Sequence, residues 1–134
     1  MKTIIEKATS FCRILELKNS GEEIPYATIA YAANKLLQEE VDETKEAIVE
    51  KDYAEILDGF ADSAFVALNG IYKTLRNIGY KDLEAIELTE NIMHRVCNAN
   101  LEKIQEDGTV KYNEHGKVQK PEGWKPPFYG DIVS

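Results

Sequence analysis

Apolar residues recur at helical spacing along four long stretches of this chain, and no other feature limits its possible folds as strongly. The first stretch begins at Ile4 and ends before the turn-like segment NSGEE at residues 19–23. The other three cover about residues 25–51, 52–77 and 82–106, with Pro25 and Asp82 as start signals and with Gly79 and an Asp-Gly pair at 107–108 as stops. Four amphipathic helices with short connections predict an all-α fold, specifically a four-helix bundle.

Residues 107–134 differ from this helical body because they hold four glycines and all the prolines except Pro25. We expect them to form an irregular tail. The segments TVKY and KVQK pair as a small hairpin around NEHG, or the whole segment folds as an ordered loop. A chain of 134 residues suits one domain, so we expect residues 1–106 as the helical bundle and 107–134 as a tail of the same domain.

The net charge of −8 argues against a protein that binds nucleic acid or anionic membranes nonspecifically, because both attract basic surfaces. No run approaches the roughly 20 apolar residues of a membrane span, and the N-terminus lacks the apolar stretch of a signal peptide. We therefore expect a cytoplasmic protein, with Cys12 and Cys97 as buried thiols.

One carboxylate falls where a core side chain is expected. On a helix that turns about 100° per residue, Ile29, Ala33, Leu36 and Ala47 all point within roughly 40° of Glu40. Glu43 lies about 60° from the centre of this apolar stripe. The other acidic residues nearby read as a solvated helix face, but that interpretation does not account for Glu40, because an unpaired carboxylate in a bundle costs several kcal/mol or becomes protonated.

The third stretch repeats this anomaly. Asp58 and Asp62 lie four residues apart on one face, Phe65 continues their line, and Glu55 lies close to it. Carboxylates that converge from two neighbouring helices repel one another, and a bound cation removes that repulsion.

Oxygen-only ligand sets favour hard divalent ions, so we interpret Glu40, Glu43, Asp58 and Asp62 as a site for Mg²⁺, with Mn²⁺ as an alternative. A di-iron bundle requires Glu-x-x-His motifs, and neither His94 nor His115 follows a glutamate by three residues. A zinc site would need histidine and cysteine ligands, which this group of residues lacks.

Polar residues near the end of the fourth stretch complete the candidate set. Asn100 lies on the same helix face as Met93, Cys97 and Ile104, so its amide occupies a core direction. The alternative is a buried asparagine whose hydrogen bonds are satisfied by a helix end or a water. Lysines in the tail either solubilise it or, beside a Mg²⁺ site, bind a polyphosphate. They are Lys111, Lys117, Lys120 and Lys125.

These motifs resemble those of the all-α nucleotide pyrophosphohydrolases, which include MazG-like proteins, dimeric dUTPases and phosphoribosyl-ATP pyrophosphohydrolase. EEVDE at residues 39–43 is similar to the first family motif, and DGFADSAFVALNG at residues 58–70 to the second. NANLEK at residues 98–103 and GKVQKPEGWKPPF at residues 116–128 resemble elements of the small phage and bacterial members.

The resemblance implies a bundle of that type, and roles for individual residues. Glu40, Glu43, Asp58 and Asp62 would hold Mg²⁺, while Glu39, with Glu40, would act on the attacking water. Substrate phosphates would contact Asn100, Lys103, Lys117 and Lys120. Many members carry a glutamate where this chain has Gly59, so Asp58 or Glu55 must replace that ligand, and we favour Asp58 because it shares a face with Asp62.

The implied reaction is Mg²⁺-dependent hydrolysis of a nucleoside triphosphate to the monophosphate and pyrophosphate, in a homodimer or homotetramer. Two alternatives stay open: hydrolysis of phosphoribosyl-ATP, and a noncatalytic Mg²⁺-binding helical module or nucleotide sensor. The sequence does not identify the base, for which Tyr72, Asn69 and Trp124 are the only candidates we name.

Overall fold

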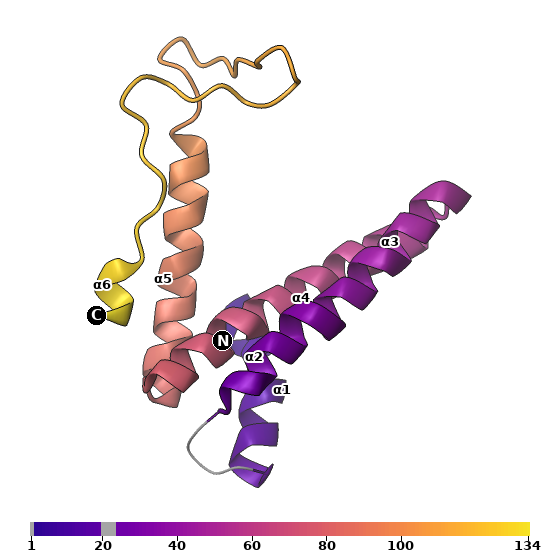
Figure 1. Cartoon of the computed structure of the whole chain (residues 1–134), viewed down its shortest axis with the longest axis vertical. Coiled ribbons are helices and arrows are strands. Elements are labelled where there is room, and N and C mark those ends of the chain that lie inside the picture. The colour runs from indigo at the N-terminus through magenta and orange to yellow at the C-terminus, as the bar shows by residue number, and fades with distance from the viewer. Residues whose placement is uncertain (1, 20–23) are drawn as a thin grey trace. The chain divides into compact units, whose positions relative to one another are not determined.

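The computed structural model describes residues 2–19 and 24–134, and it is all-α, as predicted. The expected turn at 19–23 lies almost entirely outside the described residues. None of the helices in this part of the chain has the length and apolar composition to cross a membrane. In chain order the elements are α1 (Ile4–Asn19), α2 (Tyr26–Tyr31), the π-helical segment η1 (Ala32–Leu37), α3 (Gln38–Glu50), α4 (Tyr53–Ile78), α5 (Asp82–Leu101) and α6 (Gly130–Val133) (Figure 1).

The chain divides into two compact units, residues 1–89 and 90–134. The division falls within α5, whereas the sequence pattern placed the change from helical body to tail after residue 106. In the first unit, α4 packs against α1, α2, η1 and α3. The closed four-helix arrangement stays a prediction.

Local signals set the ends of α3 and α4, which run side by side as a hairpin (Figure 1). Lys51 ends α3 in the left-handed conformation with φ of 57°, and the Asp52 carboxylate then caps α4 by accepting a hydrogen bond from the Glu55 amide at 3.2 Å. Gly79 ends α4 with φ of 124°, a conformation that favours glycine. The predicted boundaries at residues 51–52 and at Gly79 are therefore confirmed.

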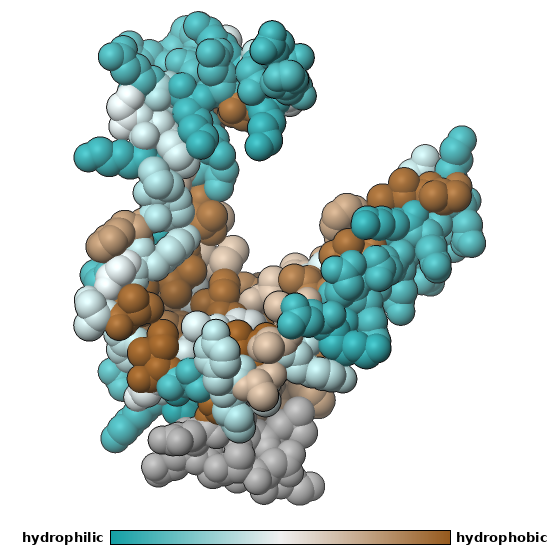
Figure 2. Space-filling model, viewed as in Figure 1, coloured by the Kyte–Doolittle hydropathy of each residue, from teal (hydrophilic) through white to brown (hydrophobic). Residues whose placement is uncertain are grey.

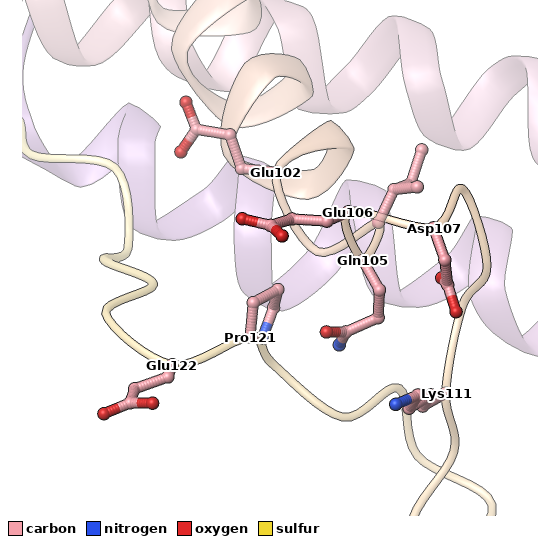
Figure 3. A pocket seen from close by; sticks show the side chains of 8 residues that line it. Glu102, Gln105, Glu106, Asp107, Lys111, Pro121 and Glu122 are labelled. Carbon is pink, nitrogen blue, oxygen red and sulfur yellow. The ribbon is translucent and has the colours of Figure 1, made fainter.

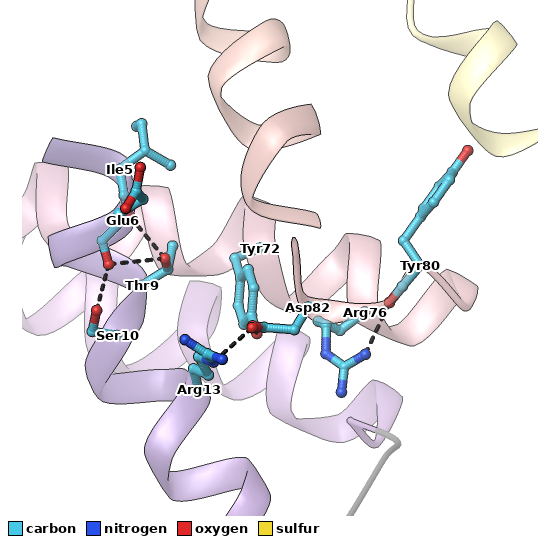
Figure 4. Close-up of polar contacts among 9 residues, drawn as sticks. All are labelled: Ile5, Glu6, Thr9, Ser10, Arg13, Tyr72, Arg76, Tyr80 and Asp82. Atoms are coloured by element: carbon cyan, nitrogen blue, oxygen red, sulfur yellow. Dashed lines mark hydrogen bonds and ion pairs between the residues drawn. The ribbon is translucent and has the colours of Figure 1, made fainter. Parts of the chain in front are cut away.

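A polar network fixes the start of α5 within the first unit (Figure 4). The hydroxyl of Tyr72, which is fully buried, donates a hydrogen bond to Asp82 Oδ1 at 2.6 Å, and the Arg13 guanidinium pairs with Asp82 Oδ2 at 2.6 Å. Asp82 was expected to cap α5, but its carboxylate binds these two side chains from α4 and α1 instead.

The second unit folds the tail back along α5. Asn113 and Lys117 close a turn through a backbone hydrogen bond of 2.7 Å, and Tyr112 and Val118 form a single antiparallel bridge, so the short hairpin is confirmed. The expectation of a wholly irregular tail is wrong for residues 130–133, because Gly130–Val133 form α6.

Two contacts hold the tail on α5. Arg95 binds both carboxylate oxygens of Asp131 at 2.8 and 2.9 Å and also donates to the Phe128 carbonyl. The indole N–H of Trp124 donates to the Ala99 carbonyl at 2.7 Å.

Several apolar residues that recur at helical spacing, where core residues are expected, are exposed. Ile48, Leu57 and Leu83 are 50%, 71% and 69% exposed, and Ala33 and Cys97 are exposed as well. Apolar surface gathers along one edge of the α3–α4 hairpin, next to a strongly polar face (Figure 2). Helical phase predicts the direction of a side chain but not whether a neighbour covers it, which is why these predictions were wrong.

Candidate functional site

A close approach between two helices positions the predicted carboxylates. Gly59 of α4 is buried against Thr44 of α3, and a Cβ at this position would overlap the Thr44 Oγ1 and lie 3.0 Å from its Cβ. The Thr44 hydroxyl turns back along its own helix and donates to the Glu40 carbonyl at 2.6 Å. A glutamate at this position, which the family resemblance implies, would clash with Thr44 at the present helix spacing.

The charges that shift the pKa of Glu40 are all negative. Partial burial raises the pKa of its carboxyl, and the negative charges of Asp62, Glu43, Asp58 and Glu39, in decreasing order, raise that pKa further. Asp62, Glu43 and Asp58 are the residues that the sequence grouped with Glu40. Glu55 is not among the charges that shift this pKa.

The four carboxylates, which we call the acidic cluster (Glu40, Glu43, Asp58 and Asp62), differ in exposure. Glu40 and Asp62 are half-buried, whereas Glu43 and Asp58 are exposed. Among the described residues, no three acidic, histidine or cysteine side chains converge closely enough to hold a metal ion. The oxygen donors and the unbalanced negative charge around Glu40 fit a hard divalent cation, while the side chains must rotate to coordinate one.

Glu39 is engaged in a different interaction. Its carboxylate pairs with Lys35 one turn earlier at 2.9 Å, and this hydrogen bond raises the pKa of the Lys35 ammonium. Both side chains are at least half exposed, so the pair is a weak one. Because half of its side chain is exposed, Glu39 contacts water while one of its oxygens is paired with Lys35.

The second unit brings together three of the four predicted phosphate ligands. The Lys103 ammonium binds the Asn100 side-chain oxygen at 2.9 Å and lies 5.2 Å from the centre of the Trp124 ring. The Lys120 ammonium lies 4.7 Å from the same ring centre. Asn100 is exposed, so the expectation that it occupies a core direction is wrong.

Trp124 has a role that the sequence reasoning missed. The ammonium groups of Lys103 and Lys120 lie over its ring, and its N–H donates a hydrogen bond to the Ala99 carbonyl. Trp124 therefore positions the two lysines rather than offering a free ring face to a base. A single tryptophan within a lysine-rich tail was the available signal. Lys117 contributes its backbone to the hairpin turn, where its N–H donates to the Asn113 side chain at 3.0 Å.

A cavity of about 670 Å³ lies elsewhere in the second unit, between the end of α5 and the tail (Figure 3). One lysine, Lys111, lines it together with four acidic side chains: Glu102, Glu106, Asp107 and Glu122. An excess of carboxylates without a bound cation repels a polyphosphate.

A comparison of the chain with models of known protein families gives no match. A comparison with curated protein sequences gives none either. The family resemblance therefore rests on the quoted motifs alone.

Proposed function

We propose that this protein is a Mg²⁺-dependent nucleoside triphosphate pyrophosphohydrolase that releases pyrophosphate and a nucleoside monophosphate. One observation carries the proposal: Glu40 is half-buried between two helices, and every charge that shifts its pKa is negative. A protein gains no stability from such an arrangement, so its presence argues for a function that uses a cation.

In this proposal the acidic cluster (Glu40, Glu43, Asp58 and Asp62) holds Mg²⁺. The ion, when bound, neutralises phosphate charge and lowers the pKa of a bound water. Glu40 also has a second role, in which its carboxylate orients the attacking water on the half-buried face of α3. Glu39, which pairs with Lys35 through one of its oxygens, accepts the proton of that water.

The basic residues bind the phosphates in the same proposal. Lys103 and Lys120 are held by the Trp124 ring and Asn100 extends the group, while Lys117 acts from the hairpin turn. Neutralising Lys103 or Lys120 is expected to raise KM for the nucleotide about tenfold, whereas the same change at exposed Lys125 leaves KM within twofold.

A noncatalytic Mg²⁺-binding module is the second candidate function. Two observations favour it: Gly59 leaves no side chain where the family resemblance expects a glutamate, and the side chains of the acidic cluster do not converge in this conformation. Hydrolysis of phosphoribosyl-ATP uses the same chemistry as the main proposal and differs only in substrate.

The deciding experiment incubates the protein with deoxy and ribo nucleoside triphosphates and with phosphoribosyl-ATP, in Mg²⁺ and in EDTA, and measures pyrophosphate and orthophosphate. Metal-dependent pyrophosphate release is expected, with a loss of about 10²-fold or more in Glu40→Gln and Asp62→Asn. Glu46→Gln is the matched control, because Glu46 is an exposed glutamate of the same helix.

Each other outcome points to a different conclusion. Turnover of phosphoribosyl-ATP alone selects that substrate. Thermal stabilisation by Mg²⁺ that Glu40→Gln abolishes, without any release, selects the binding module. Wild-type turnover in a folded Glu40→Gln protein would overturn the assignment of the acidic cluster.

A further inference from the structure

A tight contact between α3 and α4 lies within the acidic cluster. Thr44 and Gly59 are both buried, and they meet where the two helices pack together. A Cβ at position 59 would overlap the Thr44 hydroxyl and would lie 3.0 Å from the Thr44 Cβ and 3.3 Å from its Cα. The backbone of α4 therefore lies directly against a side chain of α3, with no space for a methyl group between them.

This contact also sets the alignment of the two helices along their length. α3 and α4 are joined by two residues and run antiparallel (Figure 1), so residues at equal distances from the contact face each other. Glu40 precedes Thr44 by four residues and Asp62 follows Gly59 by three, which places both carboxylates at nearly the same level. The other two members of the acidic cluster directly precede the two contacting residues in sequence.

The contact between Thr44 and Gly59 has little freedom to adjust. Thr44 is β-branched, so few χ1 rotamers are open to it in a helix, and its hydroxyl is held by the Glu40 carbonyl at 2.6 Å. Gly59 presents its backbone, which has no rotamers. Moving the helices apart would leave an unfilled gap between buried groups, which costs their packing contacts. The distance between α3 and α4 is therefore fixed at this point.

Both members of the acidic cluster on α4 are aspartates. Their carboxylates lie one methylene closer to the backbone than those of glutamates, so their positions follow the position of the helix. A cation bound by both helices must fit this spacing. Mg²⁺ binds oxygen at about 2.0–2.1 Å in a strict octahedron, whereas Ca²⁺ binds it at about 2.3–2.6 Å in flexible geometry. Ligands on opposite sides of Ca²⁺ therefore lie roughly 1 Å farther apart than those of Mg²⁺.

We infer that the contact between Thr44 and Gly59 makes the acidic cluster select Mg²⁺ against the larger Ca²⁺, which rests on the proposed function because it concerns the same cluster. Thr44 and Gly59 are positioning residues. Gly59 has no side chain and the Thr44 hydroxyl donates to Glu40, so both act through the separation of the carboxylates and not as ligands.

Calorimetric titration with Mg²⁺ and with Ca²⁺ tests this selectivity without turnover, and the ratio of the Kd for Ca²⁺ to the Kd for Mg²⁺ expresses it. We expect Gly59→Ala to weaken Mg²⁺ binding about tenfold and Ca²⁺ binding less than about threefold, because a wider spacing suits the larger ion. Gly70→Ala is the matched control, since a Cβ added at Gly70 of the same helix meets no atom within 4 Å. It should leave the ratio unchanged.

Two changes on α3 test the same spacing without altering Gly59. Thr44→Val keeps the shape of the side chain and removes its hydroxyl, so the ratio should stay within about twofold of the wild type. Thr44→Ile adds one methylene to that shape and should lower the ratio as Gly59→Ala does. Because both variants lack the hydroxyl, the pair separates helix spacing from the hydrogen bond to Glu40. Circular dichroism establishes that each variant is folded at the temperature of the titration.

The possible results distinguish this selectivity from the proposed function. If Gly59→Ala and Thr44→Ile both leave the ratio at its wild-type value in folded protein that binds Mg²⁺, the inference is overturned and the proposed function stands. Equal losses of affinity for the two ions overturn it as well, since general destabilisation lowers both alike. An equal fall of the ratio in Thr44→Val and Thr44→Ile overturns spacing as the cause. If Mg²⁺ shows no binding that Glu40→Gln abolishes, the proposed function itself is overturned, and the inference with it.

Discussion

The side chain of Thr44 occupies the space that a side chain at position 59 would need. The fold uses this contact to bring α3 against α4, and the contact also sets Glu40 near Asp62. A methyl group at position 59 therefore probes the geometry on which the acidic cluster depends.

Gly59→Ala is expected to lower the free energy of unfolding by about 1–3 kcal/mol, because the helices must separate or Thr44 must give up its hydrogen bond to Glu40. Urea unfolding measures the change. Thr44→Ala should restore part of the loss in the double variant.

Gly70→Ala is the matched control. Gly70 lies in the same helix with no atom within 4 Å of a Cβ added there, so its replacement should stabilise the protein by about 0.5–1 kcal/mol. If Gly59→Ala stabilises the protein as much as Gly70→Ala does, the Thr44 contact does not limit the helix spacing.

Glu40→Gln is expected to stabilise the metal-free protein at pH 7, by roughly 0.2–1 kcal/mol after allowance for solvent screening. The folded-state pKa of Glu40 lies above its ordinary value of 4.5, so this group favours folding below that pH and loses the benefit as the pH rises through the raised pKa. The difference between variant and wild type should therefore grow from pH 4 to pH 7. Thermal unfolding at several pH values measures it.

The same stabilisation by Glu46→Gln would mean that general repulsion between acidic residues, and not the acidic cluster, is responsible. Added Mg²⁺ should reverse the order of stability, because the wild type gains a bound cation and Glu40→Gln does not.

Tyr72→Phe is expected to cost about 1–3 kcal/mol, because it removes a hydrogen bond to a carboxylate from a fully buried position. Asp82 then keeps its ion pair with Arg13. Urea unfolding gives the value. Tyr26→Phe serves as the control, since Tyr26 is 74% exposed, and it should change stability by less than about 0.5 kcal/mol. If the two changes have equal effects, the Tyr72–Asp82 hydrogen bond does not hold the start of α5.

Asp131→Asn should loosen the end of the tail, with several-fold lower hydrogen-exchange protection of residues 128–134. Arg95 lowers the pKa of Asp131 below its ordinary value of 3.8, so the ion pair holds the tail above that pH and releases it as the pH falls through the lowered pKa. Protection relative to intrinsic exchange rates should therefore fall between pH 5 and pH 2 in the wild type and stay constant in the variant. Asp107→Asn, at a carboxylate bonded within its own loop to Thr109, should leave this segment unchanged.

Local chemistry is what the sequence predicted well. Asp52 and Gly79 mark the ends of α4 because capping and positive φ are decided within a few residues. Helical phase predicted that Glu40 lies on the apolar face of its own helix, and the negative charge of Asp62 raises its pKa.

Relationships between distant residues could not be predicted. No short-range pattern brings Trp124 to the Ala99 carbonyl, or fits Gly59 to Thr44. Leu57 and Phe60 have the spacing of core residues, yet burial depends on a covering partner that the sequence of one chain does not specify.

The π-helical segment η1 has a consequence for the rod formed by α2, η1 and α3. A π-turn takes up about one residue more than an α-turn, so residues before Ala32 are rotated by about 100° from the direction that an uninterrupted α-helix predicts. Removing one exposed residue, such as Asn34, would make the rod regular while leaving Glu40 opposite Asp62. Ile29 would then point in a different direction. The number of residues between α2 and Glu40 therefore determines which side of α2 contacts α4 when Glu40 lies near Asp62.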